Sequence, residues 1–284
     1  MIDETVGEIR DMQTHSSSVV AIKAAEALRA LLDREYPSVE EYRRDLERNS
    51  RALKRAQPSH ATLHTTQAGI RGAVADADPA DVAAAKAATA DAIDAVVESV
   101  ETGKREAAIN AAATLRDGDT LLTHDYSSTM LEAIESATQD GKLLEVYVSE
   151  ARPRYLGRKA ARHLSAMDRA ETHLVTDAAA GYVMDECDAV VVGMDCIVGD
   201  VLYNRVGTFP IAATAAELAV PFTVVGSSAK VIDEGGFQFE NEHRPASEVM
   251  LEPAEGFDVE NPAYDATPTH LVDSVITDEG TLSL

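Results

Sequence analysis

The sequence is poor in aromatic residues and in cysteine. It has no tryptophan, aromatic residues make up 5% of its 284 positions, and its two cysteines are Cys187 and Cys196. Two cysteines without a CxxC or cysteine–histidine spacing make neither a disulfide framework nor a zinc site of the usual kind. We therefore expect free thiols in a reducing compartment, with no metal and no other cofactor.

Long hydrophobic runs are also missing. No stretch approaches the roughly 18 consecutive apolar residues that a membrane helix requires. The first twelve residues carry acids where a secretory signal carries a basic and then an apolar stretch. These features predict a cytoplasmic protein without membrane contact. The hydrophobic content of 45% suits a globular chain of one or two domains.

Positive charge is scarce. The chain has 49 acidic against 25 basic residues and a formal charge of -24, and few of the bases are lysine. Such a surface repels DNA, RNA and anionic lipid, so DNA is not an expected partner. Acid in excess suits multimolar salt, in which the screening length falls to about 3 Å. We interpret the charge as the mark of a halophilic protein rather than of a binding partner.

The first third of the chain has helical periodicity. Apolar residues recur at intervals of three and four in 16–36 and again in 39–57. A proline-interrupted loop begins at residue 73 and leads into one long alanine-rich helix that reaches residue 113. The sequence thus predicts a helical N-terminal domain over residues 1–112.

From residue 117 the pattern changes to short apolar runs that alternate with amphipathic stretches. We predict helices over 127–139, 156–166, 178–186 and 208–219, and strands in TLLTH, LLEVYVSE, THLVTD, DAVVVGMD and FTVVGSS. Continuous valine and leucine runs separated by helices are typical of a parallel sheet covered on both faces. The predicted fold class is α/β, with a Rossmann-like parallel-sheet domain over residues 113–284.

Polar residues follow these predicted strands. Ligands of such sheets bind beyond the carboxyl ends of the strands, which here hold 124–127, 150–153, Asp177, 193–195 and 226–228. Neither GxGxxG nor GxxxxGK[ST] follows any of the strands, which argues against the common dinucleotide and P-loop modes. The strand ends nevertheless predict a ligand pocket.

Four segments carry a resemblance to a known family: LLTHDYSSTM, VSEARPRYLGRKAARHL, VTDAAAGYVMDECDAVVVGMDCI and YNRVGTFPIAATAAE. In order and spacing they resemble the translation initiation factor 2B alpha/beta/delta family, in which ribose-1,5-bisphosphate and methylthioribose-1-phosphate isomerases stand beside non-catalytic regulatory subunits. The resemblance covers about residues 118–230. It implies a phosphorylated sugar or nucleotide as ligand, self-association into dimers or hexamers through the C-terminal domain, and a translation initiation factor as a further candidate partner.

The resemblance also assigns catalytic positions. The family's isomerases use a cysteine after Thr-His and the aspartate of Gly-Ala-Asp. Asp195 matches the aspartate of Gly-Ala-Asp, whereas Asp125 stands where the isomerases have the cysteine. The loop Thr-His-Asp-Tyr-Ser therefore resembles that of the regulatory subunits. If Asp125 and Asp195 face each other, repulsion between their charges can keep one carboxyl protonated as a general acid.

Candidate ligand contacts come from the strand ends and from the resemblance. Asp177 is interpreted as a helix N-cap and Cys196 as packing, because neighbours on a strand point to opposite faces. The isomerases have an Arg-Gly-Ala phosphate loop where this chain has residues 12–18, which lack glycine. The predicted ligand-binding residues are Arg10, His124, Tyr126, Ser127, Glu150, Arg152, Asn204 and Arg205.

Two hypotheses stay open. The first is a regulatory protein that binds a sugar phosphate or nucleotide without turnover, which the Thr-His-Asp-Tyr-Ser loop favours. The second is an aldose/ketose phosphate isomerase acting on ribose 1,5-bisphosphate or a relative, which Asp195 and the motif order favour. We place the first above the second, because a thiol with a pKa of about 8.5 and a carboxyl with one of about 3.9 differ widely as proton donors.

Overall fold

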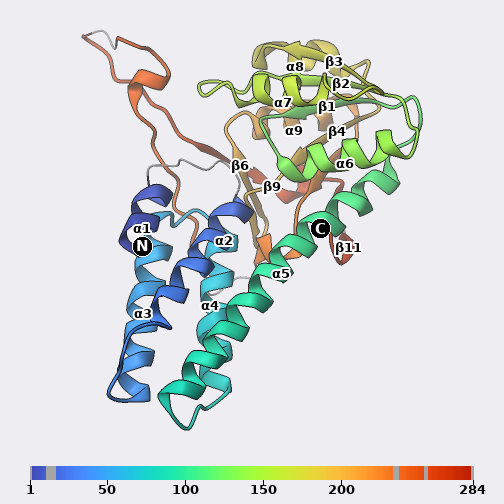
Figure 1. Cartoon of the computed structure of the whole chain (residues 1–284). Helices are drawn as coiled ribbons and strands as arrows, with labels where there is room; N and C mark the ends of the chain where they lie inside the picture. Colours follow the sequence, from blue (N-terminus) through green and yellow to red (C-terminus); the bar gives the residue numbers. More distant parts are fainter. Residues whose placement is uncertain (1, 11–16, 233–236, 253–254, 283–284) are drawn as a thin grey trace. The chain divides into compact units, whose positions relative to one another are not determined.

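The structure is a computed structural model that describes residues 2–10, 17–232, 237–252 and 255–282. It divides into two compact units, Met1–Thr102 and Gly103–Leu284 (Figure 1). The division falls inside the long helix α5 (Val82–Thr114), ahead of the domain limit predicted at residue 112. Within the described ranges, no helix has the length and apolar character needed to cross a membrane.

The first unit is helical in its described residues, which hold α1 (Ile2–Arg10), α2 (Ser17–Ala27), the turn η1 (Leu28–Leu31), α3 (Val39–Ala56), α4 (Ala61–Asp76) and the start of α5. Ser38 starts α3, since its hydroxyl accepts a hydrogen bond from the Glu41 N–H at 3.3 Å. The fully buried Tyr42, Leu53 and Ile70 lie in one apolar core. Periodicity does not predict α4, because glycines and threonines interrupt its apolar pattern.

The second unit contains a seven-stranded sheet in the order β11-β10-β7-β4-β1-β2-β3. All neighbouring strands are parallel except the β10–β11 hairpin. The predicted α/β class, a helical region followed by a largely parallel sheet, is confirmed. The strands are β1 (Thr120–His124), β2 (Leu144–Ser149), β3 (Ala170–Val175), β4 (Ala189–Gly193), β7 (Phe222–Val225), β10 (Ser274–Thr277) and β11 (Gly280–Leu282).

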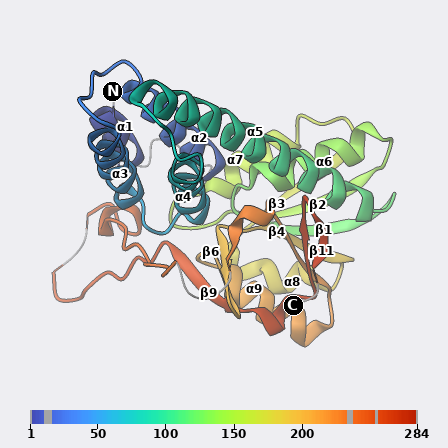
Figure 2. The same ribbon diagram turned by 90° about the horizontal axis from the view of Figure 1, so that it is seen from below.

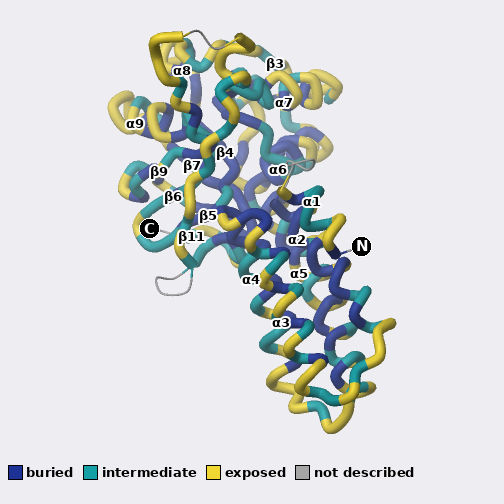
Figure 3. The backbone as a smooth tube through the Cα atoms, turned by 90° about the vertical axis from the view of Figure 1, so that its left-hand side faces the viewer, coloured by how far each residue is buried: buried dark blue, intermediate teal, exposed yellow. Residues whose placement is uncertain are grey.

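Helices cover both faces of this sheet, because alternate strand residues point to opposite faces. Leu121 and Val191 pack in a cluster with α6 (Ser128–Gln139) and α7 (Leu156–Leu164). Leu122 and the neighbours of Val191 pack in a second cluster with α8 (Ala180–Met184) and α9 (Thr208–Leu218). Figure 3 shows the resulting layers, with buried strands inside and exposed residues on loops and outer helix faces.

A second sheet, of four short strands, is not predicted by the sequence pattern. Its order is β8-β5-β6-β9, with β5 (Cys196–Val198), β6 (Val201–Arg205), β8 (Val231–Ile232) and β9 (Tyr264–Pro268). Figure 2 shows β6 and β9 side by side. β5 and β8, of three and two residues, are too short to produce a detectable period, and β6 and β9 have five residues each but no continuous apolar run. Arg205, the last residue of β6, is one of the predicted ligand-binding residues, so this sheet positions part of the candidate site.

Candidate functional site

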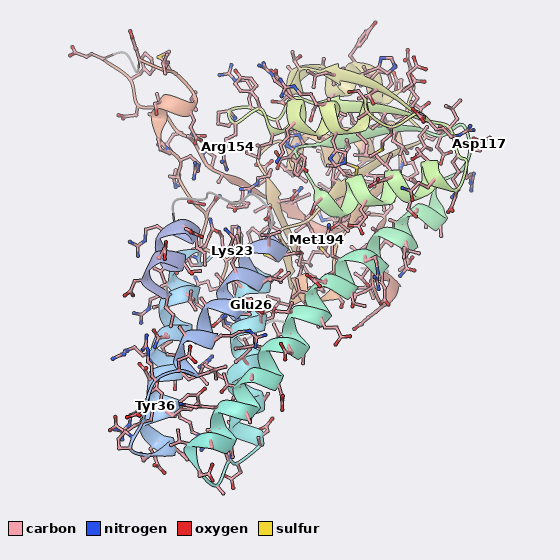
Figure 4. All side chains as sticks on the ribbon, viewed as in Figure 1. Lys23, Glu26, Tyr36, Asp117, Arg154 and Met194 are labelled. Atoms are coloured by element: carbon pink, nitrogen blue, oxygen red, sulfur yellow. The ribbon has the colours of Figure 1, made fainter. Side chains whose placement is uncertain are left out.

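The polar residues predicted to follow the strands lie at one edge of the large sheet. Asp125 directly follows β1, and Met194 and Asp195 follow β4. Arg154 lies in the loop after β2. Figure 4 shows Arg154 and Met194 on one side of this unit and Asp117, which precedes β1, on the opposite side. Parallel strands share a carboxyl edge, so residues far apart in sequence come together there.

At the centre of the site, Arg205 is placed between two carboxylates. Its Nε lies 3.4 Å from Oδ2 of Asp125 and 4.0 Å from Oδ2 of Asp195. All three side chains are largely buried, with 11–12% exposed. The guanidinium also lies over the Tyr264 ring, 4.6 Å from its centre. Burial lowers the pKa of Arg205, but the charges of Asp195, Tyr264 and Asp125 raise it by more. The pKa of Arg205 therefore lies above its ordinary value.

The backbone at Asp125 adopts an unusual conformation, with φ of 64°. This is the left-handed region, which aspartate tolerates better than most residues other than glycine. The turn places the Asp125 side chain at the end of β1, where it is largely buried and lines a cleft. The two aspartates therefore meet at one guanidinium, as a pair separated by positive charge rather than in direct contact.

An arginine-rich cleft opens beside this pair. Its empty space, including the open solvent at its mouth, is about 330 Å³, and Arg152, Arg154, Arg205 and Arg244 all line it. Burial lowers the pKa of Arg154, and the positive charges of Arg244 and Arg205 lower it further. Crowding of like charges favours an anion in the cleft. Asp195 is not among the lining residues and reaches the cleft only through Arg205.

The segment after β8 supplies one wall of the cleft. Arg244 Nη2 lies 2.6 Å from Glu248 Oε1, an ion pair four residues apart around the turn η4 (Ala246–Glu248). Burial raises the pKa of Glu248, but the hydrogen bond and charge of Arg244 hold it below its ordinary value. Arg152 donates to the Val249 carbonyl at 3.1 Å and so ties the β2–α7 loop to this wall.

His124, a predicted ligand contact, has both ring nitrogens in use within the protein. Nε2 lies 2.8 Å from the Val206 carbonyl and must donate to it, so in the neutral ring Nδ1 accepts from the Ser149 hydroxyl at 2.6 Å. Gly207 has φ of 108°, and a Cβ there would lie 2.6 Å from the His124 ring. In this conformation His124 ties β1 to the β6–α9 turn and leaves no ring nitrogen for a ligand.

Other predicted contacts likewise have partners in the protein. Ser127 caps α6 by accepting from the Met130 N–H at 3.3 Å, and Asn204 donates to the Thr208 hydroxyl at 3.0 Å. Such bonds hold the framework around the cleft. Two further contacts are between Arg158 and Glu150, at 2.6 Å, and between Lys159 and the Tyr126 ring, at 4.3 Å from its centre.

Asp177 has a different role from the predicted helix cap. Its two carboxylate oxygens accept hydrogen bonds from the N–H groups of Ala151 and Arg152, at 2.8 and 2.7 Å. These groups belong to the loop after β2, so Asp177 holds that loop from the end of the neighbouring β3. The tertiary contact takes both oxygens, which a local cap would otherwise use.

Two predictions concern the first unit. Arg10 is the exposed last residue of α1, and its predicted ligand contact stays a prediction. Of the loop at 12–18, residues 12–16 lie outside the described residues.

Three cationic residues of the site escaped the sequence analysis. Arg154 follows Arg152 by two positions, and Arg244 lies in a segment without strand or helix periodicity. Lys230 is buried, and its Nζ donates to the Met194 carbonyl at 2.8 Å, next to Asp195. Burial lowers the pKa of Lys230, while the charge of Asp195 opposes this effect. A lysine in a three-residue turn carries no sequence signal for such a position.

The cysteines do not take part in the site. Cys187 and Cys196 are both buried free thiols. Burial raises the pKa of Cys187 to about 12. Burial, followed by the charge of Asp195, also raises the pKa of Cys196. Thiols in this state are poor nucleophiles, which agrees with the predicted packing role of Cys196. Among the described residues, no cluster of three or more potential ligands could hold a metal ion.

Fold and site together define an α/β protein in which a helical unit precedes a parallel sheet, and an arginine-rich cleft lies beside two aspartates at the sheet's carboxyl edge. The sequence pattern of the Initiation factor 2 subunit family matches residues 13–283. The chain belongs to this family.

The proteins that are similar to this chain are named for different functions. The ribose 1,5-bisphosphate isomerase of Haloterrigena turkmenica is 32% identical over 294 residues, which cover 97% of this chain and 88% of that protein. The ribose 1,5-bisphosphate isomerase of Haloferax volcanii is 29% identical over 98% of this chain and 88% of its own length. Among solved structures, the Pyrococcus horikoshii OT3 translation initiation factor eIF-2B has a TM-score of 0.84 and 26% identity, covering 99% of this chain and 96% of that one.

Proposed function

We propose that this protein is a sugar-phosphate isomerase that acts on ribose 1,5-bisphosphate or a close relative at the cleft described above. The observation that carries the proposal is the placement of Asp125 in an arginine-lined cleft, on the same guanidinium as Asp195. Arginines at the ends of strands and loops are suited to phosphate groups, because their planar forks match phosphate oxygens.

The reaction needs groups that move protons beside a held phosphate. Converting a ribose 1-phosphate ring into the 2-ketose breaks the bond between C1 and the ring oxygen and moves the C2 hydrogen to C1. The C2 hydroxyl becomes a carbonyl, and its proton is balanced by one gained at the ring oxygen. One acid and one base meet this need. We assign the ring oxygen to Asp125, which lines the cleft, and the hydroxyl to Asp195, the aspartate that the family's isomerases keep. The second assignment requires the Arg205 side chain to move from between the two carboxylates when the sugar binds.

The relatives support isomerisation more than regulation. The proteins of Haloterrigena turkmenica and Haloferax volcanii that cover nearly the whole chain are both named ribose 1,5-bisphosphate isomerases. This support reverses the order in which the sequence alone placed the two hypotheses. Self-association is also part of the proposal, since a related solved structure is a tetrameric eIF2B beta–delta complex from C. thermophilum, similar in fold with a TM-score of 0.79.

A second candidate function is ligand binding without turnover. It is favoured by Asp125 at the cysteine position and by Arg205, which lies between the two aspartates and separates Asp195 from the cleft. A carboxyl with an ordinary pKa of about 3.9 holds no proton to donate at neutral pH. In this case the cleft would hold the same phosphorylated sugar, or a nucleotide, as a regulatory ligand.

Phosphorus NMR on the purified full chain with ribose 1,5-bisphosphate separates the two candidates. The isomerase should convert the sugar to its 2-ketose at a rate near the common enzyme value of about 10 s⁻¹. Calorimetric binding without conversion would favour the second candidate. Absence of both would remove the cleft as a sugar-phosphate site.

A further inference from the structure

The acidic chain has a basic stretch in its helical unit, in addition to residues 151–167 beside the cleft. From Arg48 to Ala75 there is no aspartate or glutamate, although acids outnumber bases 49 to 25 in the whole sequence. This stretch includes the C-terminal half of α3 and nearly all of α4, which pack against each other. The reaction proposed above does not use it.

The two helices form a groove, here called the α3–α4 groove. Its empty space, including open solvent, is about 760 Å³, and it is lined by Arg43, Leu46 and Glu47 of α3 and by Ala68, Arg71, Gly72, Val74 and Ala75 of α4. Three of the α4 residues are alanine or glycine, and a Cβ added at Gly72 would touch nothing within 4 Å. Small side chains on α4 therefore leave the groove open between charged walls.

Charged residues form one row on α3 that starts in this groove. Arg43, Glu47, Arg51 and Lys54 follow one another at spacings of four, four and three. Arg43 and Glu47 line the groove, and Arg51 and Lys54 continue the row beyond it. Glu47 Oε1 lies 2.7 Å from Arg51 Nη2 and 3.1 Å from Arg71 Nη1. One carboxylate is thus shared by two guanidiniums, so this cluster keeps an excess of positive charge.

The surroundings of Arg43, Lys54 and His64 also indicate an excess of positive charge in this cluster. Nε and Nη2 of Arg43 are buried and make no hydrogen bond in the described parts of the chain, and Nη2 lies 3.8 Å from Asp78 Oδ1 in a long ion pair. Burial lowers the pKa of Lys54, and the charges of Arg71 and Arg51 lower it further. Burial also lowers the pKa of His64, and the positive charges of Lys54 and Arg71 lower it further. Each charge in the cluster is unfavourable for the others, which an anion would relieve.

We propose that the cationic cluster at the edge of the α3–α4 groove is a second anion site, which binds a compact, multiply charged phosphate group through Arg71, which lines the groove, and through Arg51 and Lys54 beside it. The site is compact because acids flank it. Asp45 precedes the basic stretch on α3, and Asp76 ends α4. A long polyanion such as RNA would run from the groove onto an acidic surface, which repels it over about 8–10 Å at ordinary ionic strength.

Calorimetry with inorganic pyrophosphate tests this site. The measurement uses the full-length Arg154→Gln protein, so that the cleft of the second unit contributes less to binding. Lys54→Gln and Arg71→Gln, added to that background, should each weaken binding by about tenfold or more, as expected for one charge-assisted contact. Arg44→Gln is the matched control, because Arg44 lies on the same helix with 79% of its side chain exposed. Circular dichroism checks that each variant is folded.

The His64 ring gives a second, local readout. A bound anion favours its protonated form, so pyrophosphate should raise the pKa of His64 back towards its ordinary value of 6.5 in an NMR titration. An unmoved His64 titration, or equal weakening in Arg44→Gln, would overturn the proposal. Tighter binding of a single-stranded RNA than of pyrophosphate would overturn the compact ligand. None of these outcomes depends on isomerase turnover, so the two proposals fail separately.

Discussion

At the scale of single residues, the charge of Arg205 controls the pair of aspartates. Its guanidinium lies within 4.0 Å of both carboxylates and over the Tyr264 ring. Arg205 contributes to the balance of both buried carboxylates, and Lys230 contributes beside Asp195, since a buried carboxylate without a partner is unfavourable by several kcal/mol. Asp125 and Asp195 thus share one cation from the small sheet.

Arg154→Gln should weaken binding of ribose 1,5-bisphosphate more than Arg152→Gln does. Arg154 lies among like charges in the cleft, whereas Arg152 already donates to the Val249 carbonyl. We expect a loss of about 10–100-fold for Arg154→Gln, the value of one charge-assisted hydrogen bond. Calorimetry at constant potassium chloride measures it. A larger loss for Arg152→Gln would show that the phosphate lies nearer the β2–α7 loop.

Asp125→Asn should lower isomerisation without abolishing binding. The amide keeps the shape of the side chain but cannot exchange a proton, and a general acid or base contributes about 10²–10⁴-fold to a rate. Phosphorus NMR gives the turnover, and calorimetry gives the affinity. If Asp125→Asn keeps the full rate, another group is the proton donor. Asp125→Cys then tests whether the family's thiol raises the rate in the same pocket.

At the scale of secondary-structure elements, the loop between β2 and α7 is held by a neighbouring strand end. Asp177→Ala should destabilise the protein by about 1.5–3 kcal/mol, because two N–H groups lose a charged acceptor. The same change should weaken ligand binding, since Arg152 and Arg154 lie on the released loop. Urea unfolding and calorimetry measure the two effects.

The exposed Asp185 is the control for this change. It lies at the C-terminus of α8 and has no structural role assigned above, so Asp185→Ala should change neither stability nor affinity by a comparable amount. Unaltered stability of Asp177→Ala would mean that the loop is held by its other contacts.

At the scale of the whole molecule, charge sets the response to salt. A formal charge of -24 on 284 residues opposes the compact state through self-repulsion, which salt screens. We expect the melting temperature to rise as potassium chloride increases from 0.1 to several molar, with the steepest change at the low end. A thermal series followed by circular dichroism tests this. A melting temperature independent of salt would contradict the halophilic interpretation.

Much of the fold follows from local sequence. Valine and leucine runs such as Ala189–Gly193 are long enough to specify buried strands, and the helices between them have clear apolar faces. The period changes near residue 117, which separates the helical region from the sheet. α4 does not follow, because glycines and threonines weaken its apolar pattern. The small sheet does not follow either, because β5 and β8 are too short and polar residues interrupt β6 and β9.

The sequence by itself determined the fold class, the family and the edge of the sheet at which polar residues gather, because each depends on local periodicity or on motif order. Only the tertiary structure decided what these residues contact. His124 and Asp177 are held by groups that are distant in sequence, and Arg205 meets both aspartates because the small sheet returns to the ends of β1 and β4. Side-chain partners depend on how strands and loops meet in space, and local sequence does not record that.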